Sequence, residues 1–134
     1  MRKGRSRVVV LCNSSGSHFG YAETLNKLGY YSVSLCSRVA EVVCLLELGI
    51  RFEYLVYDGF DLRKHADHLK KLVKHNGIGS IIAVSDVNSR ECKTIFLWAK
   101  DQEIPLGSVL QAPLRSNELY KLIGSNPLSD ESFL

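Results

Sequence analysis

The sequence lacks the patterns that mark disulfide-rich, zinc-binding and membrane proteins. None of its four cysteines, at positions 12, 36, 44 and 92, forms a C-x-x-C pair, and its four histidines stand at no zinc-finger spacing from them. No apolar run has the length of a membrane span, and a charged fraction of 23% is ordinary for a soluble globular protein. We therefore predict a cytoplasmic protein whose cysteines are reduced and behave as small hydrophobic side chains.

The chain also has little excess charge. Its net charge is +3, and the basic start at residues 2–7 contributes part of it. This positive charge is too small for a nucleic-acid-binding face. The apolar run at residues 8–12 is too short for a secretion signal. A chain of 134 residues fits one domain that needs no disulfide or metal. We predict a domain over residues 1–124 and a tail or linker over residues 125–134.

Apolar runs of strand length alternate with helical patterns along the chain, which is typical of a doubly wound α/β domain with a parallel sheet covered on both faces. The predicted strands are Arg7–Cys12, Tyr31–Leu35, Glu53–Tyr57, Ser80–Val84 and Gly107–Leu110. The predicted helices are His18–Leu28, Val39–Leu48, Arg63–Asn76, Ser89–Asp101 and Ser116–Ile123. Glycines 29, 49 and 77 follow three of these helices and are expected to close them in the left-handed conformation.

Two polar residues end predicted strands in the middle of the chain. Asp58 ends the third and Ser85 the fourth, where the carboxyl ends of parallel strands open into a crevice that displays chemistry. Both residues also have a purely structural interpretation, in which they end a strand only to cap the next helix. Asp58 would cap the following helix, and Ser85 or Asn88 would cap the helix that begins near Ser89.

With Asp58 at the end of its third strand, this five-fold βα pattern resembles the receiver domain of two-component response regulators over residues 7–123. The resemblance implies a (βα)5 flavodoxin-like three-layer sandwich with strand order 2-1-3-4-5. It places Asp58 at the phosphoacceptor position and Ser85 at the position of the hydroxyl that contacts the phosphoryl group. The stretch from Ser85 to Gln111 is long, which weakly resembles receivers fused to cyclic-di-GMP phosphodiesterase (EAL) modules.

The remaining receiver positions are degenerate. The acid pair that holds magnesium falls on Cys12 and Asn13, and the lysine position falls on Gln111 or Ala112. Phosphoryl transfer relies on a magnesium ion and a lysine to neutralise charge on the phosphoryl oxygens. With one carboxylate left, we expect at most weak Mg²⁺ binding at Asp58, no other cofactor, and a pseudo-receiver that is phosphorylated poorly or not at all.

A receiver-like domain of this kind is expected to act by protein contact and not as an enzyme. It would control a fused output domain or bind a protein partner, or dimerise through its last two helices. The candidate contact residues are Trp98, Leu106, Leu119 and Tyr120, since aromatic and large apolar anchors dominate interface energies.

A second interpretation uses the Ser-rich loop at residues 13–18. This loop leads into a helix and superficially resembles the phosphate loop of flavodoxins, which predicts a flavin or nucleotide-phosphate module. Against it, Phe60 is the only aromatic residue in a position to flank a flavin ring. His65 and His68 share a face of the third predicted helix, and we interpret them as a polar helix face in preference to a metal site.

Overall fold

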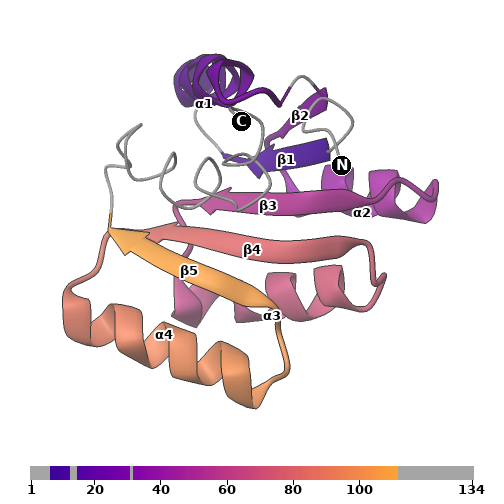
Figure 1. Cartoon of the computed structure of the whole chain (residues 1–134). Helices are drawn as coiled ribbons and strands as arrows, with labels where there is room; N and C mark the ends of the chain where they lie inside the picture. The colour runs from indigo at the N-terminus through magenta and orange to yellow at the C-terminus, as the bar shows by residue number, and fades with distance from the viewer. Residues whose placement is uncertain (1–6, 13–14, 31, 112–134) are drawn as a thin grey trace, which may run out of the picture.

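The computed structural model describes residues 7–12, 15–30 and 32–111 (Figure 1). The strands are β1 (Arg7–Leu11), β2 (Ser32–Cys36), β3 (Phe52–Asp58), β4 (Ile78–Ser85) and β5 (Leu106–Gln111). The helices are α1 (Ser15–Lys27), α2 (Val39–Glu47), α3 (Leu62–Val73) and α4 (Ser89–Asp101). None of these described helices is both long enough and apolar enough to cross a membrane.

The strands form one parallel sheet in the order β2-β1-β3-β4-β5, as predicted. Strand β3 lies at the centre, with Leu55 paired to Val9 of β1 on one side and to Ile81 of β4 on the other. All strands run in the same direction, so their carboxyl ends meet at one edge. That edge carries the site described below.

Each face of the sheet has its own apolar core. On one face, strand residues such as Leu55 pack with Val42 of α2, Leu69 of α3 and Ile95 of α4. On the other face, Val8, Val10 and Val56 pack with Tyr21 and Leu25 of α1. Both faces of the central strands are buried, which is why their sequences are continuous apolar runs.

The fifth predicted helix, Ser116–Ile123, and the proposed domain boundary after residue 124 lie outside the described residues. Helix α1 begins at Ser15, three residues before its predicted start. Gly29 and Gly49 close their helices with φ of 97° and 92°, as predicted.

The prediction for Gly77 is wrong, because Asn76 takes the left-handed conformation after α3, with φ of 51°. Gly77 is needed for a different reason. A Cβ there would stand 2.5 Å from the Leu46 side chain of α2, so a larger residue at this position would have to displace that side chain.

The observed helix caps test whether Asp58 caps α3 and whether Ser85 or Asn88 caps α4. The α3 cap is Asp61, whose carboxylate accepts a hydrogen bond from the Arg63 amide at 2.9 Å, so the expectation that Asp58 caps this helix is wrong. The α4 cap is Asn88, one of the two candidates, whose side chain accepts from the Glu91 amide at 2.9 Å. Asp58 and Ser85 are therefore left for other roles.

Candidate functional site

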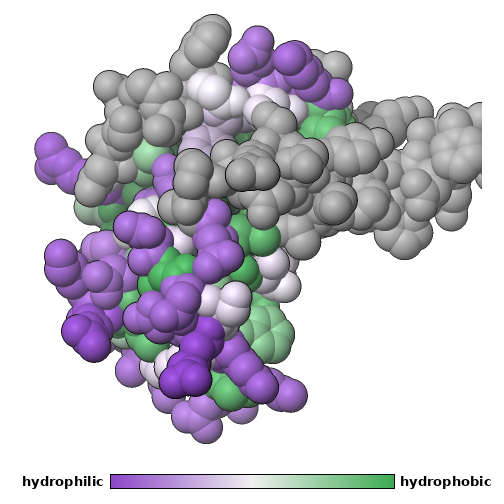
Figure 2. All heavy atoms as spheres, turned by 90° about the vertical axis from the view of Figure 1, so that its left-hand side faces the viewer, coloured by the Kyte–Doolittle hydropathy of each residue, from purple (hydrophilic) through white to green (hydrophobic). Residues whose placement is uncertain are grey.

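The predicted site residues converge at the carboxyl edge of the sheet. In the strand register Asp58 pairs with Val84, and Ser85 pairs with Gln111. Figure 2 views the molecule from the side toward which the β3, β4 and β5 arrows of Figure 1 point, where polar side chains surround smaller apolar patches. The structure thus brings Cys12, Asp58, Ser85 and Gln111 to the ends of four adjacent strands.

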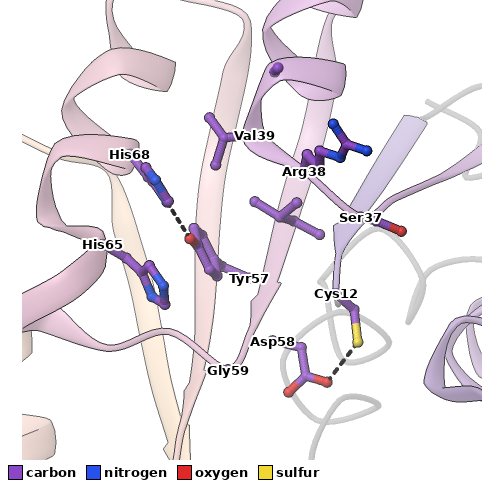
Figure 3. A pocket seen from close by; sticks show the side chains of 11 residues that line it. Cys12, Ser37, Arg38, Val39, Tyr57, Asp58, Gly59, His65 and His68 are labelled. Atoms are coloured by element: carbon purple, nitrogen blue, oxygen red, sulfur yellow. Dashed lines mark hydrogen bonds between the residues drawn. The ribbon is translucent and has the colours of Figure 1, made fainter. Parts of the chain in front are cut away.

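The Asp58 carboxylate is engaged by neutral donors. The Cys12 thiol donates a hydrogen bond to Asp58 Oδ2 at 3.2 Å (Figure 3). Burial raises the pKa of Tyr21 far above its usual range, the Asp58 carboxylate and Cys12 raise it further, and a hydrogen bond from the Tyr21 hydroxyl to Asp58 adds to the effect. Asp58 therefore joins β3 to the end of β1 and to α1.

Ser85 is fully buried and its hydroxyl is committed. Its Oγ donates to the backbone carbonyl of Phe60 at 2.6 Å, and the amides of Gly59 and Phe60 donate to the Val84 carbonyl at 2.9 and 3.0 Å. These bonds hold the loop after Asp58 against the end of β4. The hydroxyl can reach a phosphoryl group only if it gives up the Phe60 carbonyl.

The residue at the lysine position is also tied to backbone. The Gln111 amide donates through Nε2 to the Val87 carbonyl at 2.7 Å, which links the end of β5 to the loop before α4. Gln111 carries no charge to offer an anion. Asn13, the second position of the acid pair, and Ala112, the alternative lysine position, lie outside the described residues.

The donor set at Asp58 does not fit Mg²⁺. This ion demands near-octahedral oxygen coordination, whereas the described neighbours of the carboxylate are a thiol and a phenol. Among residues 7–12, 15–30 and 32–111, no three histidine, cysteine, aspartate or glutamate side chains gather as a metal site. We therefore derive no chemistry through a metal here.

A cavity of about 530 Å³ opens beside Asp58, between the ends of β1 and β3, the start of α2 and the first turns of α3. Its volume is in the range of small-molecule pockets. Figure 3 shows the rings of His65 and His68, from α3, turned toward Tyr57 of β3. Arg38 lines the cavity from the α2 end.

Tyr57 and the two histidines form an aromatic cluster in the cavity wall. Tyr57 Oη shares a hydrogen bond of 2.6 Å with His68 Nδ1, and burial raises the pKa of Tyr57 to about 12. The two imidazole rings stack with centroids 5.1 Å apart. The shared face of His65 and His68 was predictable from their spacing, but nothing in the sequence paired them with Tyr57.

Tyr21 is the other site residue that sequence reasoning missed. It occupies an apolar position of α1, buried with Leu25, where a tyrosine is read as core. Its hydroxyl meets Asp58 only because α1 covers this face of the sheet. In the sequence, the one sign of this role was the hydroxyl group that Tyr21 carries on an otherwise apolar face of the helix.

The remaining candidates differ in exposure. Leu106 is only 7% exposed and belongs to the core, and Trp98 is half-buried and packs against the same core. The exposed apolar residues of α4 are Phe96 and Leu97. Leu119 and Tyr120 lie outside the described residues. Phe60, on which the flavin interpretation depends, is 2% exposed and packs edge-on against Tyr57, so it offers no face to a flavin.

Comparison with protein-family models and with curated protein sequences gives no match. Among solved structures, a Burkholderia pseudomallei protein described as pilus assembly-related matches with a TM-score of 0.68 and 21% identity, covering 90% of this chain and 88% of that one. A response regulator from Colwellia psychrerythraea matches with a TM-score of 0.70 and 14% identity, covering 94% and 98%.

A third similar structure is the N-terminal domain of a response regulator/sensory box/GGDEF three-domain protein from Carboxydothermus hydrogenoformans. It has a TM-score of 0.67 and 12% identity, and the match covers 96% of this chain and 98% of that domain. In each of the three comparisons, the matched backbone covers at least 90% of this chain. The chain therefore has the CheY-like fold of response-regulator receiver domains.

Proposed function

We propose that this chain is a receiver-like regulatory domain that signals through protein contacts without phosphorylation of Asp58. One observation carries the proposal: the Asp58 carboxylate is occupied by donors from Cys12 and Tyr21. A phosphoryl group on Asp58 would have to displace both of them. It would then meet no lysine, since the lysine position of receivers falls on Gln111 or Ala112.

The lost charges weaken phosphorylation at two stages. Without an acid pair, magnesium has too few oxygen ligands to bind before the phosphodonor arrives. Without a cation at Gln111, the charge that spreads over the phosphoryl oxygens in the transition state is left uncompensated. Each loss reduces the rate independently, so restoring one position alone is expected to recover little.

The experiment is a backbone amide NMR titration of the purified chain with magnesium, followed by beryllofluoride as a phosphoryl mimic. We expect no saturable shifts at millimolar magnesium and none with beryllofluoride. The matched comparison is a Cys12→Asp/Gln111→Lys variant, in which magnesium-dependent shifts around Asp58 should appear. Saturable shifts in the unmodified chain that spread from Asp58 and Ser85 to α4 and β5 would refute the proposal.

The contact surface in this proposal is the exposed side of α4. Phe96 and Leu97 are 42% and 54% exposed, and the lysines at positions 93 and 100 flank them. The similar three-domain response regulator carries its receiver at the N-terminus. By analogy, the exposed side of α4 would contact a fused output domain or a separate protein partner.

Homodimerisation through the same side of α4 is the alternative contact. Sedimentation equilibrium tests it, with Leu97→Ser as the disruptive variant. Leu48→Ser is the matched control, because Leu48 is 75% exposed but follows α2. A dimer that only Leu97→Ser dissociates supports dimerisation, whereas a monomer at all concentrations excludes it and leaves a fused output domain or a separate protein as the partner.

A further inference from the structure

Three helices of this domain begin with a side chain that accepts hydrogen bonds from backbone amides, but the chemistry of the acceptor differs. At α2 the Glu41 carboxylate accepts from the Ser37 and Arg38 amides at 2.7 and 2.9 Å. At α4 the Glu91 carboxylate accepts from the Asn88 amide at 3.2 Å. These two acceptors are the third residues after Arg38 and Asn88, as in a capping box.

At α3 the third residue after the cap is Lys64, which cannot accept a hydrogen bond. The next residue, His65, replaces it: its ring Nδ1 accepts from the Asp61 amide at 3.0 Å. An imidazole nitrogen accepts a hydrogen bond only when it carries no proton, so this bond requires neutral His65 with its proton on Nε2. The capping bond of α3 therefore depends on a group that titrates near neutrality.

The position of His65 in the cluster opposes its protonation. Burial lowers the pKa of His65 below its usual value, and His68 and Lys64 lower it further, while Asp61 acts in the opposite direction. Protonation of His65 would place a positive charge against the stacked His68 ring, 5.1 Å away between centroids. The ionisable and charged groups around His65, from its own helix, the adjacent strand ends and across the cavity, are Asp61, Lys64, His68, Tyr57, Asp58, Cys12 and Arg38.

We infer that His65 is a proton-responsive latch on the loop between β3 and α3. Protonation of Nδ1 would turn the acceptor into a donor, and the Asp61 amide would lose its partner. The loop that contains Gly59 and Asp61 would then loosen next to Asp58 and the cavity. Phe60 stays anchored in the core, so the change would be confined to the loop backbone and the first turn of α3. The latch would give the domain an input other than phosphate.

The same geometry argues against a metal at this histidine pair. A metal on Nε2 of His65 would leave a ring with no proton, because Nδ1 already accepts from Asp61. Histidines that ligate metals donate their other ring N–H to an acceptor. The two rings therefore serve hydrogen bonding and stacking.

The test is an amide NMR titration of the whole chain from about pH 8 to about pH 5, the range in which histidines change charge. In the unmodified chain, the Gly59 and Asp61 amides should shift together with the His65 ring and lose protection from hydrogen exchange. The Arg38 and Asn88 amides, which are capped by carboxylates, should not follow that transition. A ring spectrum showing Nδ1 of neutral His65 protonated would overturn the inference.

Two variants separate His65 from the other histidines. His65→Gln keeps an acceptor that does not titrate, so the Asp61 amide should stay protected throughout and its pH response should vanish. His75→Gln should leave the response intact, because His75 lies beyond the cluster at the end of α3. If the Asp61 amide of His65→Gln still follows the same transition, the latch is refuted. This result is independent of whether Asp58 is phosphorylated.

Discussion

The core around β3 and the edge at its carboxyl end are built from adjacent residues but are held by different kinds of contact, apolar in the core and polar at the edge. Leu55, in the middle of the strand, is fully buried and contacts side chains that any doubly wound α/β domain would supply. Asp58, three residues later, is held by Cys12 and Tyr21. The apolar pattern accounts for the buried core, whereas the contacts at the edge depend on a few polar side chains. The CheY-like fold of this chain therefore does not by itself determine whether Asp58 is phosphorylated.

The sharpest test of this difference is the truncation of a central core residue. Leu55→Ala should lower the free energy of unfolding by about 2–5 kcal/mol, because it removes buried methyl groups and leaves a cavity between two strands and α3. Urea denaturation measures the change. The control is Leu48→Ala, at a leucine that is 75% exposed, where a change within about 0.5 kcal/mol is expected. Equal losses in the two variants would contradict the assignment of the core.

Ser85 lies between the two regions, because it is as buried as the core but belongs to the edge. Ser85→Ala should destabilise the protein by about 1–3 kcal/mol, since the Phe60 carbonyl loses the donor that satisfies it. The Gly59 and Phe60 amides should also lose hydrogen-exchange protection. Ser34→Ala, on the edge strand β2, is the comparison and should change stability by less than about 0.5 kcal/mol. A neutral Ser85→Ala would mean that the loop is held by its backbone bonds alone.

The core and the edge also differ in how far the sequence predicts them. Continuous apolar runs such as Val8–Cys12 and Ile81–Val84 identify the central strands, because burial on both faces leaves no place for polar residues. The same reasoning placed Asp58, Ser85 and Gln111 at neighbouring strand ends, which the register confirms. What Asp58 touches was not predictable, because no local pattern tells a helix residue such as Tyr21 which strand end it will meet.

The Asp58 contacts can be tested one bond at a time. Tyr21→Phe removes the hydroxyl while keeping the ring in the core, so it should cost about 1.5 kcal/mol, the lower end of the range for a hydrogen bond to a charged acceptor. In an Asp58→Ala background the same substitution should cost almost nothing, because the acceptor is gone. The coupling energy from this double-mutant cycle isolates the Tyr21–Asp58 bond. Additive effects would show that the tyrosine stabilises the protein only through packing.

The smallest predicted effect concerns pH, and it distinguishes the α3 cap from the rest of the edge. The pKa of His65 is lower in the folded protein than its usual value, so the unfolded chain binds the proton more readily. The free energy of unfolding should therefore be highest when the histidine is neutral in both states. It should fall as pH decreases through about 6.5, the pKa of an unperturbed histidine.

Urea denaturation of the unmodified chain and of His65→Gln over this pH range measures the effect. The unmodified chain should lose stability relative to the variant as the pH falls, because glutamine keeps an acceptor for the Asp61 amide that does not titrate. Glu41 and Glu91 cap α2 and α4 with carboxylates and not with an imidazole, so these two caps should not follow the histidine transition. If the free energies of unfolding of the two proteins change with pH in parallel down to about pH 5, the α3 cap does not depend on His65 protonation and does not differ from the α2 and α4 caps.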